Sequence, residues 1–562
     1  MPAEPRLHLL FAHERGEPFL DDGPDERSAA NQVAPVGVQQ HLADGAAAAS
    51  DIEKQRWAVM AATGAEGDRL LSLVARLIVS RADAQGAEVL SIRVPPGLDA
   101  VAARRWKTDI YPNVYGSEPR RPGYVCILGD LDQVSLATQR ELALDGFPGR
   151  LALPSDEDYQ AYVDKVLAWE HRTSAHDRAR SLFYTVHDRT EATIAGHEKL
   201  VAPCLRECQQ LRREEFPASS VENAGNPDEP DPDELLTLAA SDHPTVMFSM
   251  SHGIGPPRGR SYTAEEARHR QGAMHFGRQG ALMPDDVGQG AFLPGGLWLY
   301  FACFGAGTPV QSAYRRWLAM LEQNGMTGLG PLGGVLRGLD QGGGFVSGIA
   351  KAALANPRGP LALIGHVDLA WSYGYEELRV NDDGSITGKS RARHFSTLLA
   401  RLVKGERAGA AFSAMQQARS DVGWELNNHY DRCREAGGGV EGVDERERLA
   451  LGHLWMRHQD LDGYVLLGDP AVRLPLASPA RPRDPRALLG FAPSAGARGA
   501  RERPRLDDAE KTILALANGQ ITASEAAVEL EVSRGEAERW ERAYRDAGLR
   551  ALKNLITGGD ES

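Results

Sequence analysis

Two short apolar runs, each followed by a reactive side chain and a glycine, constrain the fold of this chain most strongly. The first, residues 246–250, leads through one serine to His252 and Gly253, and the second, residues 297–302, leads directly to Cys303. Short apolar runs closed by glycine are typical of buried strands in a parallel sheet. Such sheets bind ligands beyond the carboxyl ends of their strands. We therefore predict that the histidine and the cysteine, 51 residues apart in the sequence, lie at adjacent strand ends.

This pair of side chains has the chemistry of a cysteine nucleophile and its base. A free thiol with a pKa of about 8.5 is only slightly ionised at neutral pH. A neighbouring imidazole raises the reactive population and can protonate a leaving amine. The glycine after His252 permits close approach of a substrate backbone and frees its N–H for an oxyanion. The alternative is structural: His252 caps a strand, and Cys303 is a small core residue.

The rest of the chain alternates predicted strands with predicted helices, which indicates an α/β fold with a mostly parallel sheet. A long polar loop between the two apolar runs is expected to line the substrate cleft. Strands are predicted at residues 88–94, 124–128, 180–186, 361–364 and 464–467, and helices at 68–78, 158–170, 198–213 and 311–323.

Changes in composition divide the chain into five predicted parts. They are an irregular leader (1–50), which either covers the site or has no role, an N-terminal α/β subdomain (51–175), a catalytic subdomain (176–475), a Pro/Arg/Ala/Gly-rich linker (476–505) and a helix-turn-helix-like domain (506–556). The last part has the spacing of a helix-turn-helix. Its acidic and basic residues are nearly equal in number, so protein docking is as plausible there as DNA binding.

Charge and cysteine content exclude several classes of function. A net charge of −14 argues against a chain-wide nucleic-acid or membrane-binding surface. Five cysteines, an odd and small number, indicate free thiols in a reducing compartment. Cys204 and Cys208 lack a second metal-binding pair at zinc spacing, so no metal and no cofactor is expected. Since no run is long enough for a membrane span or a signal-peptide core, we expect a cytoplasmic protein without membrane contact.

The order of the strand ends resembles the gingipain-type branch of the caspase-like cysteine peptidases over about residues 100–475. His-Gly followed by Ala-Cys-x-Gly about 50 residues later is the caspase-type pattern. The elements that carry the resemblance are Gly129-Asp130, His252-Gly253, Ala302-Cys303-Phe304-Gly305, Ala370-Trp371 and Gly468-Asp469-Pro470. The resemblance implies a caspase-like three-layer sandwich with two α/β subdomains, to which this chain adds a small all-α C-terminal domain.

The resemblance also implies roles for individual residues. Cys303 corresponds to the nucleophile, His252 to the general acid/base, and the N–H groups of Gly253 and Cys303 to the oxyanion hole. Asp188 falls near the specificity pocket, where a carboxylate favours a Lys or Arg side chain; the alternative is a helix N-cap. Trp371 corresponds to a pocket wall, or else is core or rim.

Two further residues lie beyond the next predicted strand. His366 and Asp368 suggest a second dyad, and the preferred interpretation makes them loop residues that shape the cleft, with Asp368 among the substrate-binding residues.

The leading functional hypothesis is an intracellular cysteine endopeptidase that forms an acyl-enzyme on Cys303 and cleaves a protein or peptide substrate, with a basic residue before the scissile bond. One alternative is a catalytically silent caspase-like scaffold. Another is a regulator whose C-terminal domain binds DNA or a protein partner.

Overall fold

A computed structural model describes nine segments of the chain, all within the compact unit formed by residues 1–479. They are residues 11–12, 48–112, 121–172, 176–211, 214–256, 262–323, 343–381, 385–435 and 445–477. Most of the predicted leader, most of the predicted linker and the whole helix-turn-helix-like domain lie outside the described residues.

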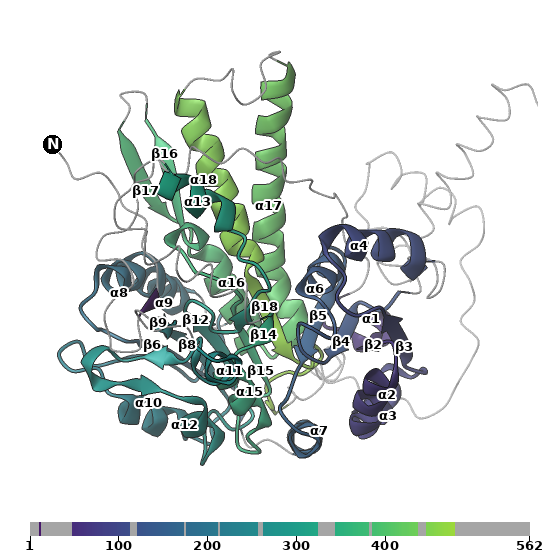
Figure 1. Cartoon of the computed structure of the whole chain (residues 1–562). Coiled ribbons are helices and arrows are strands. Elements are labelled where there is room, and N and C mark those ends of the chain that lie inside the picture. Colours follow the sequence, from purple (N-terminus) through teal and green to yellow (C-terminus); the bar gives the residue numbers. More distant parts are fainter. Residues whose placement is uncertain are drawn as a thin grey trace, which may run out of the picture. The chain divides into compact units, whose positions relative to one another are not determined.

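One ten-stranded sheet runs through the described unit (Figure 1). Its strands, in spatial order, are β3 (Leu90–Val94), β2 (Trp57–Ala62), β4 (Tyr124–Leu128), β5 (Phe147–Leu151), β18 (Tyr464–Gly468), β15 (Ala362–His366), β12 (Leu297–Phe301), β8 (Thr245–Met250), β6 (Arg180–Thr185) and β7 (Ser220–Ala224). Neighbouring strands are mostly parallel, and β18 is antiparallel to β15. The predicted mostly parallel α/β sheet is confirmed.

Helices cover both faces of this sheet and produce three layers. The α-helices are α1 (Ile52–Gln55), α2 (Ala65–Leu73), α3 (Ala75–Gln85), α4 (Ala100–Arg105), α6 (Leu136–Leu142), α7 (Asp156–His171), α8 (Glu191–Gly196), α9 (Ala202–Gln210), α10 (Pro232–Ala239), α11 (Ala264–Arg270), α12 (Pro284–Gly288), α13 (Arg315–Gln323), α15 (Gly348–Ala355), α16 (Arg393–Val403), α17 (Ala408–Glu435) and α18 (Glu445–Asp462). Single π-turns occur at η2 (Trp106–Ile110) and η4 (His197–Val201), and 3-10 turns at η5 (Gly277–Gln279) and η6 (Ser372–Gly374).

Strand β2 shows why the N-terminal subdomain has helices on both faces. All six of its residues are buried. Successive side chains point to opposite faces of a strand, and Trp57, Val59 and Ala61 join one apolar cluster while Ala58 and Met60 join another. The first cluster includes side chains from α2, α3 and α7, and the second includes side chains from η2 and α6.

Buried and partly buried polar contacts join the predicted N-terminal and catalytic subdomains. Asp469, which follows β18, accepts hydrogen bonds from Trp57 Nε1 (2.8 Å) and from Arg81 (2.8 and 2.6 Å). Asp130, which follows β4, accepts from the Val346 amide (2.7 Å) and from the Lys351 ammonium (2.6 Å). Two motif positions named in the sequence analysis, Asp130 and Asp469, therefore make contacts between the parts of the chain predicted as separate subdomains.

Several elements differ from the sequence-based expectation. The predicted polar loop between β8 and β12 contains α11, α12 and the short strands β10 (Met274–His275) and β11 (Ala281–Leu282). The helix predicted at 311–323 begins only at Arg315. Strands β2, β5 and β7, the long helices α17 and α18, and the hairpin of β16 (Glu376–Val380) and β17 (Ile386–Ser390) were not predicted.

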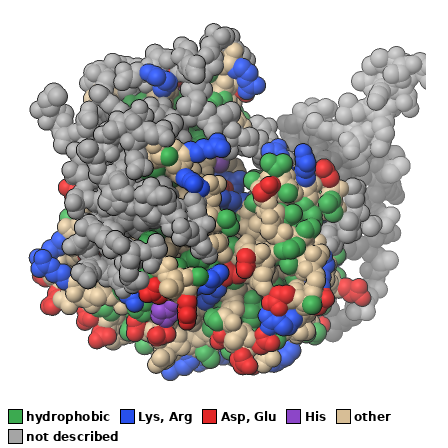
Figure 2. All heavy atoms as spheres, viewed as in Figure 1, with side chains coloured by type: hydrophobic (Ala, Val, Ile, Leu, Met, Phe, Trp, Pro, Cys, Tyr) green, Lys and Arg blue, Asp and Glu red, His purple; other side chains and the backbone are tan. Residues whose placement is uncertain are grey.

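The described surface mixes both signs of charge. Acidic and basic side chains are interspersed over the face shown in Figure 2. No helix within the described segments is long and apolar enough to cross a membrane. Helices α17 and α18 pack side by side and extend beyond the sheet (Figure 1).

Candidate active site

The predicted histidine and cysteine follow two adjacent parallel strands of the sheet. Strands β8 and β12 pair over five positions, and the last pair is Met250 with Phe301. His252 and Cys303 each lie two residues beyond that pair, at the same edge of the sheet. Both residues are fully buried. The register therefore brings together the two side chains that the sequence analysis singled out.

Gly253 is packed directly against the backbone of Cys303. A methyl group added at Gly253 would lie 1.9 Å from the carbonyl oxygen and 3.3 Å from the amide nitrogen of Cys303. Because no side chain fits there, glycine is required at this position. The backbones of the two residues assigned to the oxyanion hole are thus in contact.

A short strand from the leader adjoins this site. Strand β9 (His252–Ile254) pairs on one side with β10, antiparallel, and on the other with β1 (Phe11–Ala12), parallel. Phe11 is opposite Gly253. The Ile254 amide donates to Ala273 on the β10 side (2.9 Å). Since backbone groups alternate along a strand, those of Gly253 face the edge that β1 covers.

A hydroxyl relay holds the imidazole of His252. Its Nε2 lies 2.8 Å from Thr190 Oγ1, and Thr190 Oγ1 donates to Asp188 Oδ1 (2.8 Å). Thr193 Oγ1 also donates to Asp188 Oδ1 (2.6 Å). The second carboxylate oxygen, Oδ2, lies 3.6 Å from His252 Nε2. The Asp188 side chain is only 1% exposed, so this contact is shielded from water.

The relay selects one tautomer of neutral His252. Thr190 has a single hydroxyl proton, which it gives to Asp188. Its oxygen must then accept from Nε2–H, and the lone pair of the neutral ring lies on Nδ1. The nitrogen with basic character is therefore the one opposite the relay.

A second histidine faces His252 across the strand pair. His275 on β10 is the direct partner of His252 in the register, and its Nδ1 accepts from the Gly277 amide (2.9 Å). Burial, together with the neighbouring His252, lowers the pKa of His275 to about 4. His275 is therefore neutral at physiological pH and adds no competing positive charge beside His252.

The sulfur of Cys303 contacts the backbone of Ala370. The Ala370 amide donates to Sγ (3.2 Å), and the thiol lies 3.6 Å from the Ala370 carbonyl oxygen. Burial raises the pKa of the Cys303 thiol well above its ordinary value, while the Ala370 amide lowers it. In this closed arrangement the cysteine is a protonated thiol, so attack on a carbonyl requires a base.

Two strained residues support the turn that follows Cys303. Phe304 has φ of 58° and Asp368 has φ of 132°, both unfavourable for residues with a Cβ. The Phe304 amide donates to the Asp368 carbonyl (2.8 Å). The Asp368 carboxylate accepts from the amides of Leu369 (2.8 Å) and Ala313 (2.9 Å). Asp368 is 3% exposed, and its carboxylate binds backbone amides in the interior. It therefore helps to hold the loop that contacts Cys303.

His366 also helps to hold this loop. It is fully buried, its Nδ1 lies 3.1 Å from the Asp368 carbonyl and its Nε2 lies 3.2 Å from Asp460 Oδ1. Asp460 also accepts from the amides of Trp371 (2.9 Å) and Gly374 (2.6 Å). The contacts of His366 are with Asp460 rather than with a nucleophile.

Trp371 is enclosed by aromatic rings in this structure. Its ring centroid lies 5.8 Å from that of Tyr314 and 5.4 Å from that of Trp317, in both cases edge to face. The residue is fully buried. Whether it forms a pocket wall when substrate is bound stays a prediction.

The structure brings together most of the predicted site residues. His252, Gly253, Cys303 and Asp188 form one cluster, and the loop of Asp368 and Trp371 touches it through Ala370. The N-cap of α8 is Thr190, whose hydroxyl accepts from the Thr193 amide, so the N-cap alternative for Asp188 is wrong. The sequence analysis assigned no role to four residues that have contacts here: Thr190, Thr193, His275 and Asp460. It named Ala370 as a motif position, without its contact to Cys303.

The motif Asp188-x-Thr190-x-x-Thr193, just after a strand, was the available signal for part of this network. No group of three or more His, Cys, Asp or Glu side chains suited to a metal ion occurs among the described residues.

Comparisons with known proteins give a fold-level likeness and one family match. Residues 510–560 match a family described as a helix-turn-helix domain, which agrees with the predicted tail. No curated protein matches the chain.

Among solved structures, the chain is similar to the Arg-specific cysteine proteinase gingipain R, with 14% identity, a TM-score of 0.40, and coverage of 75% of this chain and 78% of that one. It is also similar to the complex of RgpB pro- and mature domains from Porphyromonas gingivalis (13%, 0.39, 75% and 79%) and to a structure described as a protease (12%, 0.41, 74% and 78%). At this level of similarity they assign no activity to the chain.

Proposed function

We propose that this protein is a cysteine endopeptidase with Cys303 as nucleophile and His252 as general acid/base. The observation that carries the proposal is the register of β8 and β12, which places both side chains at one edge of the sheet. The relay from His252 through Thr190 to Asp188 supports it, because it directs the basic lone pair to Nδ1.

The proposed reaction has two stages. His252 Nδ1 takes the thiol proton as Cys303 Sγ attacks the peptide carbonyl, and the carbon–sulfur bond forms. The imidazolium then protonates the leaving amine, the carbon–nitrogen bond breaks, and an acyl-enzyme remains. In the second stage water gives a proton to His252 and attacks the thioester. The carbon–sulfur bond breaks, the acid product leaves, and His252 returns its proton to the sulfur.

Asp188 favours the charged form of His252 in both stages. Its Oδ2 lies 3.6 Å from Nε2, so an imidazolium formed during the reaction has a carboxylate partner shielded from water. The developing oxyanion would accept hydrogen bonds from the amides of Cys303 and Gly253, whose backbones are in contact. The Ala370 amide, at 3.2 Å from Sγ, stabilises the thiolate.

The basic-residue preference rests on the resemblance rather than on the contacts of Asp188. Both oxygens of Asp188 face the His252 relay, which supports a role in holding the base. Asp368 uses both oxygens for backbone amides, which supports a role in holding the loop. The contacts of these two carboxylates therefore give no support to a pocket for Lys or Arg, and the preference stays a proposal from the resemblance alone.

A positional-scanning peptide library on the purified protein tests the proposal and the preference together. We expect cleavage by the wild type and none by Cys303→Ala, whose thermal unfolding should stay close to that of the wild type. Cleavage by Cys303→Ala at the wild-type rate would disprove the assigned nucleophile. Selection of an apolar residue before the scissile bond would disprove only the basic preference.

Two other functions have support of their own. A silent scaffold is consistent with the complete burial of His252 and Cys303, and the library would reveal it as a lack of any cleavage. A DNA-binding role is supported by the family match at residues 510–560. A salt titration of DNA binding by the full chain tests this role, since binding without salt dependence excludes phosphate contacts.

We also propose a cytoplasmic location, because all five cysteines are free thiols.

A further inference from the structure

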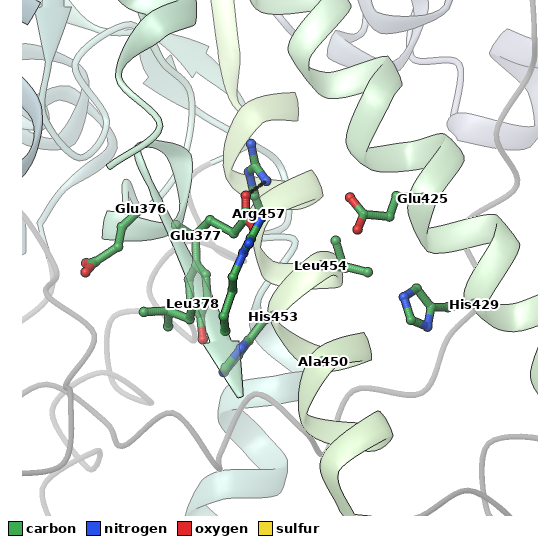
Figure 3. A pocket seen from close by; sticks show the side chains of 11 residues that line it. Glu376, Glu377, Leu378, Glu425, His429, Ala450, His453, Leu454 and Arg457 are labelled. Carbon is green, nitrogen blue, oxygen red and sulfur yellow. Dashed lines mark hydrogen bonds and ion pairs between the residues drawn. The ribbon is translucent and has the colours of Figure 1, made fainter. Parts of the chain in front are cut away.

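A cavity of about 380 Å³ lies apart from the catalytic strand ends, between the hairpin strand β16 and helices α17 and α18 (Figure 3). This volume falls within the range of small-molecule sites, roughly 300–1,000 Å³. Its lining side chains come from all three elements and from the turn before β16: Tyr373, Glu376, Glu377, Leu378, Arg379, Glu425, His429, Ala450, His453, Leu454 and Arg457.

The carboxylate of Glu377 is shared by three arginines. Arg379 Nε donates to it at 2.6 Å, Arg391 donates at short range, and Arg457 Nη1 lies 3.4 Å away. The side chain of Glu377 is 18% exposed. Burial raises its pKa, but the hydrogen bonds and charges of these arginines outweigh burial and lower it overall. This carboxylate is therefore surrounded by three positive charges, and Glu425 adds a second negative charge that acts on Arg379 and Arg457.

Arg457 is the least satisfied of the three. Its side chain is 13% exposed, and the 3.4 Å contact with Glu377 is its one hydrogen bond within the described residues. Its Nε is buried without a hydrogen-bond partner there. A guanidinium has five N–H donors in a planar fork, and a buried cation without partners is costly. Burial lowers the pKa of Arg457 accordingly.

Two histidines lie on the same walls of the cavity. His453 precedes Arg457 by one helical turn on α18 and is 5% exposed, and His429 lines the cavity from α17. Burial lowers the pKa of His429. The field of Arg457 also reaches His394, whose pKa burial and this cation together lower to about 3. A neutral imidazole has one N–H donor, so the lowered pKa of His429 leaves it able to donate a hydrogen bond to an anion.

The acidic residues of the lining limit the size of the anion. Glu376 is 4% exposed and already paired with Lys199 (2.7 Å). Glu425 projects from α17 beside His429 (Figure 3). Because these carboxylates would repel an extended polyanion, the cavity suits one compact charged group.

We propose that this cavity binds a small molecule through an oxyanion group, a phosphate or a carboxylate, with the Arg457 guanidinium as its main partner. Both groups match the fork of a guanidinium with two parallel hydrogen bonds. The site is separate from Cys303 and does not depend on the proposed peptidase activity.

Isothermal titration of the full chain with inorganic phosphate and, separately, with acetate tests this proposal at constant ionic strength. We expect saturable binding of at least one of them, with a Kd on the order of 1 mM or tighter. The tighter of the two identifies the group. In Arg457→Met the binding should weaken at least tenfold, roughly the loss expected for a charge-assisted hydrogen bond.

Two further variants make the result specific. Arg434→Met removes the same charge from α17 outside the lining, where Arg434 pairs with Asp431 (2.5 Å), and should bind like the wild type. Arg457→Lys keeps the charge without the fork and should bind with intermediate affinity. The proposal is overturned if neither anion saturates the protein at tens of millimolar, or if Arg457→Met and Arg434→Met bind equally well.

Discussion

Replacing Thr190 with valine removes the hydroxyl that links His252 to Asp188 while keeping the shape of the side chain. Four contacts are lost: the 2.8 Å contact with His252 Nε2, the 2.8 Å bond to Asp188, a 3.1 Å contact with Thr193 Oγ1 and the long 3.4 Å cap of the Thr193 amide. The contact with Thr193 Oγ1 adds little, because the protons of both hydroxyls go to Asp188. At a net of about 1 kcal/mol for each good hydrogen bond and less for the long cap, the free energy of unfolding should fall by about 2 kcal/mol.

The effect on catalysis should exceed that of an equally destabilising change. Without the Thr190 oxygen, no hydroxyl fixes Nε2–H, and the Nδ1–H tautomer of His252 becomes populated. Because that tautomer cannot take the thiol proton through Nδ1, kcat should fall about tenfold or more, which corresponds to the roughly 1.4 kcal/mol of a bond to a charging group. Ring ¹⁵N NMR of the histidines reports the tautomer directly.

Thr193→Val is the matched control. The single hydroxyl proton of Thr193 lies between Asp188 Oδ1 (2.6 Å) and the Thr190 carbonyl (3.1 Å), so the loss of stability on its removal should be similar. It makes no direct contact of this kind with His252, so kcat should change little. If kcat falls equally in both variants, the relay does not orient the base, and the account of the His252 tautomer fails.

Three other predictions follow from the same contacts. Burial raises the pKa of Asp368, so its ionisation lowers the free energy of unfolding as pH rises from about 4 through the raised pKa. Asp368→Asn cannot ionise there, and urea titrations should show it gaining stability relative to the wild type over that range. Deletion of residues 1–47 removes β1 from the edge of β9 and should raise the rate of Cys303 alkylation, and an unchanged rate would show that β1 does not cover the site. Burial lowers the pKa values of His275 and His458 to about 4, so the unfolded state binds more protons than the folded state below about pH 6.5. The free energy of unfolding should therefore fall by about 1.4 kcal/mol per pH unit for each residue down to pH 4. A urea midpoint that stays constant between pH 6.5 and 4 would contradict this.

The strand ends of the site could be predicted because their signals are local. An apolar run that ends at a glycine can be recognised without knowing what packs around it. From such runs the sequence analysis placed His252 and Cys303 at one sheet edge, which the strand pairing confirms. The carboxylate of Asp188 was also found. Its link to His252 was not, because the contact of Thr190 with His252 joins residues 62 positions apart and leaves no pattern in the neighbouring sequence.

The elements that were missed lack such local signals. Strand β2 is apolar on both faces and alanine-rich, so neither alternation nor β-branched residues mark it. Helix α17 mixes alanine with polar residues over 28 positions, and its burial depends on α16, α18 and β5. The enclosure of Trp371 by Tyr314 and Trp317 joins residues more than 50 positions apart, and no periodicity reports such a contact.

Covalent labelling tests the central assignment most directly. A peptidyl acyloxymethyl ketone with the side chain selected by the peptide library is incubated with the full chain, and the labelled peptide is located by mass spectrometry. We predict a label on Cys303 that is lost in His252→Ala, whose fold is checked by its unfolding temperature. Equal labelling of Cys126 or Cys433, or labelling of Cys303 that does not depend on His252, would contradict the assignment of this pair as nucleophile and base.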